Sequence, residues 1–187
     1  MSLKALIGRP YELLVELERR AKAAIAVRQG DDIATDEWVG IGFRLGTEHF
    51  VAGRGEVREV LPVPEQITRI PGAKPWLRGI ANVRGQLLTV ADLRSFLGAG
   101  RAQLDRHARI LLVASREVPT ALIVDEVSGF RRFRDADYNE QAPATVIRCE
   151  HYLKGAFRRG TEVWPRFSLP ALLEDEQFQN AGESAGA

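Results

Sequence analysis

The stretch that decides the fold is PGAKPWLRGIANVRGQLLTVADLRSFLG, residues 71–98. Two prolines near its start remove backbone donors and interrupt any regular element, so a turn is expected there. Two β-prone runs, residues 80–83 and 87–90, lie on either side of a bend in which Gly85 can adopt the positive φ of a tight turn. The stretch therefore predicts an antiparallel hairpin.

A short helix is predicted directly after this hairpin. Asp92 can cap it by accepting hydrogen bonds from free backbone amides, and Gly98 can end it. Leu93, Phe96 and Leu97 fall on one helical face and are expected to pack inward.

Short apolar runs with glycine or proline bends lie on both sides of this stretch. Residues 39–45 alternate between apolar and small or polar side chains, and residues 49–52 and 57–61 continue as further strands. After the stretch, residues 110–114 and 121–124 form a second pair of apolar runs around a proline. The pattern favours an antiparallel barrel or sandwich over a parallel sheet.

An internal repeat relates two parts of the chain. Residues 152–155, YLKG, repeat residues 76–79, WLRG, and the offset from Gly79 to Gly155 is 76 residues. At the same offset the apolar helix positions recur as Leu169, Leu172 and Leu173. Each half alone would bury too little surface, so the halves are expected to share one core.

Three segments are expected along the chain. The first, residues 1–36, is predicted to be an amphipathic helix and a linker, with apolar residues recurring every three or four positions from Leu14 to Ile25. This helix either packs on its own domain or docks a partner. Residues 37–178 are expected to form a domain of two subdomains, and residues 179–187 a flexible tail.

The composition excludes several classes of protein. Of the 187 residues, 45% are hydrophobic and 27% charged, which is typical of a globular chain and not of a disordered one. The formal net charge of +1 gives no field able to hold a phosphate backbone, which argues against a nucleic-acid partner. A single cysteine excludes an internal disulfide, and the N-terminus carries no signal segment or long apolar span. We infer a cytoplasmic protein without membrane insertion.

A search for catalytic groups yields no convincing arrangement. Cys149 and His151 are two residues apart, but two ligands do not make a zinc site. Asp125 and Glu126 are adjacent on a predicted strand end, so they point apart, and a solvated strand end is the favoured interpretation. We predict no catalytic residue, no metal and no cofactor.

Two alternative functions stay open at this point. Arg131, Arg132 and Arg134 alternate with Phe130 and Phe133, a pattern that single-stranded nucleic acid can use. The other alternative is an enzyme whose site is not visible as a motif, which a perturbed carboxylate in a deep pocket would indicate.

Residues 71–98 also resemble the signature of the CheW family, the adaptor domain of bacterial chemosensory arrays. The matching positions are Trp76, Leu77, Arg78, Gly79, Asn82, Val83, Arg84, Gly85, Asp92, Leu93, Leu97 and Gly98. The resemblance covers residues 36–178 and is closest to the pilus-associated members that serve twitching motility. That subgroup is matched by Trp38, Gly40, Gly42, Phe43, the run 81–85, the run 125–127, Gly129 and Phe133.

The second half departs from the family pattern. Residues 164–169, WPRFSL, stand where many members have aliphatic residues and an aspartate, so the second helix cap is altered. Pro165 predicts an edge strand there, because proline cannot donate to a ladder.

The resemblance implies a mainly β fold of two packed five-stranded antiparallel barrels of the Src-homology-3-like kind. An N-terminal helix is added, and short helices close each half. It also implies a non-catalytic adaptor that couples a methyl-accepting receptor to the regulatory domain of a sensor histidine kinase at membrane-bound receptor arrays. The expected output is type IV pilus twitching motility, with flagellar chemotaxis as the alternative.

The resemblance further implies two binding surfaces. The residues expected to face the kinase are Val57, Arg58, Glu59 and Gly79, and those expected to face the receptor are Asn82, Arg84 and Gly85. On this basis Arg84→Glu weakens receptor binding by about 2 kcal/mol or more and leaves kinase binding intact. The alternative is a structural Arg84 that pairs with Asp92 or a backbone carbonyl.

Overall fold

The computed structural model describes residues 37–115 and 119–182. The predicted N-terminal helix lies outside these residues. The first described elements are β1 (Glu37–Leu45), β2 (Glu48–Gly53), β3 (Val57–Pro62), β4 (Leu77–Val83), β5 (Gln86–Asp92) and α2 (Leu93–Phe96). They are followed by β6 (Arg109–Val113), β7 (Thr120–Val124), β8 (Glu126–Arg134), β9 (Tyr138–Asn139), β10 (Leu153–Arg159), β11 (Glu162–Phe167), α3 (Leu169–Leu173) and α4 (Glu176–Gln179).

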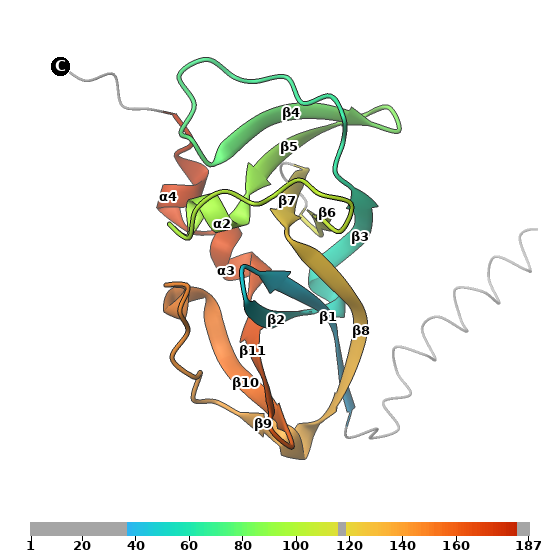
Figure 1. Ribbon diagram of the computed structural model, residues 1–187, viewed down its shortest axis with the longest axis vertical. Helices are drawn as coiled ribbons and strands as arrows, with labels where there is room; N and C mark the ends of the chain where they lie inside the picture. The colour runs from blue at the N-terminus through green and yellow to red at the C-terminus, as the bar shows by residue number, and fades with distance from the viewer. Residues whose placement is uncertain (1–36, 116–118, 183–187) are drawn as a thin grey trace, which may run out of the picture. The chain divides into compact units, whose positions relative to one another are not determined.

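The strands form two sheets, and the chain crosses between them twice (Figure 1). Sheet A has the order β8-β1-β2-β11-β10-β9, and sheet B has the order β3-β6-β7-β5-β4. After β2 the chain leaves sheet A, and β3 pairs with β6 in sheet B. After β7 it returns, and β8 lies beside β1 in sheet A. Sheet A is therefore assembled from two separate parts of the chain, and sheet B from the continuous run of strands between them.

The expectation of two five-stranded barrels is correct only in part. The fold is mainly β, but sheet A has six strands, and in the described part of the chain neither sheet closes into a barrel. The sixth strand, β9, pairs with β10 at only two positions. In sheet B, prolines at positions 62 and 64 end β3, and the outer edge of β4 is met instead by a single bridge between Thr68 and Ile80.

The internal repeat is visible in the structure. β4, β5 and α2 in one half correspond to β10, β11 and α3 in the other, and both hairpins shift register near their glycine, Gly79 or Gly155. Asp92 caps α2 by accepting from the Ser95 amide, as predicted, and Ser168 caps α3 by accepting from the Ala171 amide. A serine therefore replaces the aspartate cap in the second half.

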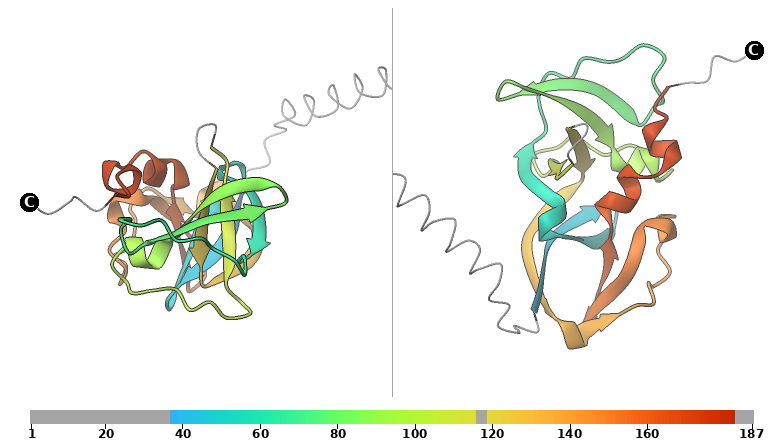
Figure 2. Two further views of the ribbon diagram at one scale, coloured as in Figure 1. Left: turned by 90° about the horizontal axis from the view of Figure 1, so that it is seen from above. Right: turned by 180° about the vertical axis from the view of Figure 1, so that it is seen from behind.

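The two sheets share one core. The largest hydrophobic cluster includes Phe43 and Phe50 from sheet A together with Leu111 and Leu122 from sheet B. The short helices α2, α3 and α4 lie on one side of the sheets (Figure 2), and α4 is fixed by Phe178. The Phe178 ring stacks on Trp76 and meets the edge of Phe96.

The expectation that Pro165 marks an edge strand is wrong. β11 lies between β10 and β2, inside sheet A. Its parallel ladder with β2 is registered only at Arg166 and Val51, one residue beyond the proline. The missing donor of Pro165 therefore lies beside this short ladder and does not interrupt it.

Each crossover between the sheets carries a buried or partly buried carboxylate. Glu56, between β2 and β3, accepts a hydrogen bond from the Leu169 amide at 2.9 Å. Asp125, between β7 and β8, accepts from the Gly46 amide at 2.6 Å and pairs with Arg94 at 3.2 Å. Asp125 is buried, so its interpretation as part of a solvated strand end is wrong: it ties α2 to the β1–β2 hairpin.

Candidate interaction surface

The tip of the β4–β5 hairpin brings together the three residues predicted to face the receptor. Arg84 and Gly85 both have positive φ, 52° and 82°, as a two-residue type I′ turn requires. The Asn82 side chain accepts a hydrogen bond from the Gly85 amide at 2.9 Å and so fixes the turn. All three residues are exposed, and Leu87 beside them is 66% exposed. The tip therefore presents a rigid, partly apolar surface.

Arg84 forms an ion pair with Glu59 of β3, with 2.5 Å between Nη1 and Oε1. Asp92, the partner suggested by sequence, pairs with Arg78 instead, at 3.6 Å. The Arg84 side chain is 72% exposed, so this pair contributes only about 0.2–1 kcal/mol to stability. Its main effect is to hold the guanidinium against β3. The pairing joins residues 25 positions apart, and no local pattern in the sequence predicts it.

The four residues predicted to face the kinase divide into two kinds. Arg58 and Glu59 offer side chains at the surface of β3, whereas Val57 is buried in the shared core. Gly79 is buried too, with φ of 136°, beneath the carbonyl of Thr68. Thr68 was not singled out from the sequence. Its pairing with β4 has only a weak sequence signal, the β-prone residues 67–68 between two proline-containing segments.

The arginine and phenylalanine group on β8 is engaged within the fold. Phe133 is buried and stacks on Phe157 with ring centroids 4.6 Å apart, and Arg131 lies over Trp164. Arg134 pairs with Asp137 at 3.1 Å. Of the two phenylalanines, Phe133 is therefore unavailable for base stacking, and Phe130 is exposed. This arrangement does not favour a nucleic-acid surface.

The groups first considered for chemistry lie apart or are inert. Cys149 is buried, and loss of water raises the pKa of its thiol to about 11, whereas His151 is exposed. Within the described residues no group of three or more His, Cys, Asp or Glu side chains could hold a metal ion. No described helix is both long and apolar enough to cross a membrane.

Comparison with known proteins identifies the family. The family model for the CheW-like domain matches residues 39–177. The chain belongs to the CheW-like domain family. This membership makes it an adaptor and not an enzyme.

Similar proteins span most of the CheW-like chain. Protein PilI of Pseudomonas aeruginosa is 40% identical over 90% of this chain and 94% of its own length. Chemotaxis protein CheW of Bacillus subtilis is 33% identical over 61% of this chain and 73% of its own length. Among solved structures, the scaffolding protein TtCheW of Thermoanaerobacter tengcongensis has a TM-score of 0.64 and 26% identity, covering 79% of this chain and 97% of that one.

Proposed function

We propose that this protein couples a methyl-accepting chemoreceptor to a sensor histidine kinase in a chemosensory array that controls type IV pili. The observation that carries the proposal is the 40% identity to PilI over nearly the whole of both chains. The kinase binds through its CheA-like regulatory domain, and the receptor through its cytoplasmic tip. The protein acts in the cytoplasm, at membrane-bound receptors, and needs no cofactor.

Two adjoining surfaces serve the two partners. The kinase-facing surface is formed by Val57, Arg58, Glu59 and Gly79. The receptor-facing surface is formed by the hairpin tip, Asn82, Arg84 and Gly85. In support, Arg58 and Glu59 are accessible on β3, and the hairpin tip is exposed and fixed by its turn. Val57 and Gly79 are buried, and they contribute by fixing the backbone that underlies this surface.

A connector transmits a signal only if it is stiffer than the contacts it joins. The two crossovers of the chain between the sheets, each held by a carboxylate, support such stiffness. The Glu59–Arg84 pair joins the two proposed surfaces, because each partner of the pair belongs to one of them.

Capture from native cells tests the proposal. The full chain, tagged and expressed at its natural level, is expected to retain both a histidine kinase with a CheA-like regulatory domain and a methyl-accepting receptor. Retention of neither, with the chain folded, would overturn the proposal.

Flagellar chemotaxis is a second candidate output, favoured by the 33% identity to chemotaxis protein CheW of Bacillus subtilis. Deletion of the gene separates the two outputs. Loss of twitching with normal swimming supports control of pili, and loss of swimming with normal twitching supports control of flagella.

A further inference from the structure

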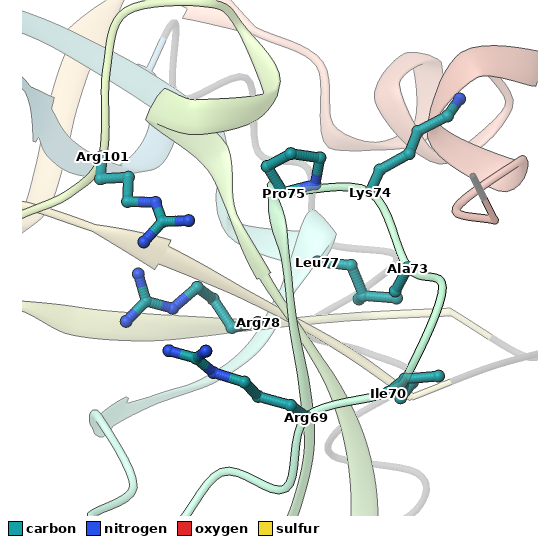
Figure 3. A pocket seen from close by; sticks show the side chains of 8 residues that line it. All are labelled: Arg69, Ile70, Ala73, Lys74, Pro75, Leu77, Arg78 and Arg101. Atoms are coloured by element: carbon teal, nitrogen blue, oxygen red, sulfur yellow. The ribbon is translucent and has the colours of Figure 1, made fainter.

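A small basic cavity lies beside β4. It encloses about 170 Å³, and its lining includes Arg69, Arg78 and Arg101. Figure 3 shows the three guanidinium groups extending into the same space, whereas Lys74 points away from them. The three arginines come from separate segments: the β3–β4 connection, β4 and the loop after α2. Their convergence is therefore a product of the fold.

Asp92 positions two of these arginines. Its carboxylate is buried and lies 3.6 Å from the Arg78 guanidinium. The same carboxylate accepts a hydrogen bond from the Ala102 amide at 3.1 Å, which fixes the backbone next to Arg101. One buried carboxylate thus holds the Arg78 side chain and also fixes the backbone beside Arg101.

Gly79 positions the third arginine. Thr68 and Ile80 exchange two backbone hydrogen bonds of 2.8 Å, which hold the β3–β4 connection against β4. A Cβ on Gly79 would lie 2.0 Å from the Thr68 carbonyl oxygen and 3.1 Å from the Arg69 Cα. Only glycine allows this approach, so Gly79 lets Arg69 lie beside Arg78.

The positive charge of the cavity is largely uncompensated. Within residues 37–115 and 119–182, neither Arg69 nor Arg101 has an ion pair or a hydrogen bond from its guanidinium. Asp92 is shared between Arg78 and backbone amides. Three converging guanidinium groups repel one another, and an anion with two oxygen atoms would relieve that repulsion.

The second half of the repeat has the same hairpin and capped helix without the cluster of three arginines. At the offset of 76 residues, Thr145 corresponds to Arg69, Lys154 to Arg78 and Gln177 to Arg101, while Ser168 corresponds to Asp92. The second half still forms its hairpin and its capped helix. The cluster is thus an addition to one half, and we look for its role outside the fold.

We propose that this cavity binds the carboxylate of a glutamate or aspartate that a partner protein presents next to an apolar residue. The volume is below the roughly 300–1,000 Å³ of small-molecule pockets, so it suits one anionic group of a larger partner. Ile70, Pro75 and Leu77 also line it, which favours an apolar neighbour on the bound segment. The net charge of +1 disfavours a polyanion such as a nucleic acid.

The inference rests on the proposed function for the existence of a protein partner and adds the chemistry of its contact. The cavity lies next to a residue of the proposed kinase-facing surface, since Gly79 belongs to that surface and underlies Thr68 and Arg69. The kinase is therefore the expected source of the acidic residue.

Titration of the isolated full chain tests the chemistry without any partner. The probes are acetyl-Leu-Glu-Glu-Leu-amide, its Gln-Gln counterpart and inorganic phosphate, and the readout is the NMR signals of the arginine side-chain Nε–H groups. We expect the Glu peptide to shift the signals of Arg69, Arg78 and Arg101 in a saturable way, and the Gln peptide to leave them unchanged. Equal shifts with both peptides, shifts with phosphate alone, or no shifts would each overturn the proposal.

Variants then connect the cavity to the partner. Arg69→Ala/Arg101→Ala removes two guanidinium groups without breaking any bond of the described fold, and Arg158→Ala, on an exposed part of β10, is the control. Kinase capture should fall at least about tenfold with the double variant, and not with the control. Undiminished capture by the double variant would overturn this inference and leave the proposed function standing. If the unchanged chain captures no kinase, the proposed function fails, and the peptide titration still decides the chemistry of the cavity.

Discussion

Gly79 shapes the surface above it because it has no side chain, and any larger residue would clash there. Its φ of 136° and the 2.0 Å that a Cβ would leave to the Thr68 oxygen make it the only residue type that fits. Gly85, at the hairpin tip, also has a positive φ, but nothing lies within 4 Å of the position that a Cβ would take there. A comparison of alanine substitutions at the two glycines therefore separates the cost of backbone strain from the cost of steric clash.

Gly79→Ala is expected to destabilise the protein by about 2 kcal/mol or more, because strain and clash add. Gly85→Ala, the matched control, should lose about 1 kcal/mol from the left-handed conformation alone. Urea unfolding measures both free energies. A loss at position 79 no larger than that at position 85 would contradict the close approach of Thr68.

The Glu59–Arg84 pair allows a charge-exchange experiment. Arg84→Glu places two carboxylates side by side and should weaken receptor binding by about 2 kcal/mol or more, with kinase binding retained. The exchanged variant, Glu59→Arg with Arg84→Glu, can rebuild the ion pair with its polarity reversed.

If Arg84 touches the receptor, the exchanged variant should still bind the receptor weakly, as measured with the purified cytoplasmic fragment. If Arg84 acts only by pairing with Glu59, receptor binding returns to its original strength, and the assignment of Arg84 to the receptor-facing surface is lost. Because the pair is exposed, stability should change by less than about 1 kcal/mol in each variant.

At the scale of elements, the crossovers and helix caps hold the sheets together. Glu56 is partly buried at the first crossover, and loss of water raises the pKa of its carboxyl above 4.5, although the Leu169 amide and Arg166 oppose this shift. A carboxyl whose folded pKa is raised stabilises the fold below its unfolded pKa. That contribution is lost as the pH rises through the folded value.

Glu56→Gln keeps an acceptor for the Leu169 amide and removes the titration. The variant is therefore expected to gain stability relative to the unchanged chain as the pH rises from about 4 to about 7. Chemical unfolding of both proteins at the two pH values measures this difference. A relative gain on acidification would mean that the ionised carboxylate stabilises the crossover.

The two helix caps should differ in strength although they occupy equivalent positions in the repeat. Asp92→Ala removes the α2 cap, the acceptor for Ala102 and the partner of Arg78, for a loss of about 3 kcal/mol. Ser168→Ala removes only the α3 cap, for about 1 kcal/mol. Unfolding free energies that fall equally in the two variants would show that Asp92 does no more than cap.

Elements with a local cause were predictable from the sequence. The hairpin at residues 80–90, its turn glycine and the α2 cap follow from neighbouring residues, and the repeat predicted two halves of similar plan. The prediction of an edge strand at Pro165 was wrong because the position of this residue inside sheet A depends on where the short ladder with β2 begins. The prediction of a solvated strand end at Asp125 was wrong because its burial depends on Arg94 and Gly46, which are distant in sequence.

At the scale of the whole molecule, sheet A is built from two separate parts of the chain, and sheet B from the continuous run between them. Sheet A takes β1 and β2 from the start and β8 to β11 from the end, and sheet B takes the strands between. Which sheet β3 and β8 join is set by tertiary packing and not by strand pattern, so the sequence could not predict it. The cluster of Arg69, Arg78 and Arg101 escaped prediction for the same reason, because three separate segments supply it.

The core shared by the two sheets and the two crossovers between them support the proposal that the described domain works as a rigid connector. Under the proposed function, the receptor contact at the hairpin tip and the kinase contact on β3 are held at a fixed separation. Under this proposal, both partners must bind this body at the same time.

Reconstitution with purified components tests this most directly. The chain, the regulatory domain of the captured kinase and the cytoplasmic fragment of the captured receptor are mixed and analysed by sedimentation. We expect one complex that contains all three, and no complex of kinase domain with receptor fragment when the chain is left out. Displacement of one partner by the other, or a kinase–receptor complex that forms equally well without the chain, would contradict it.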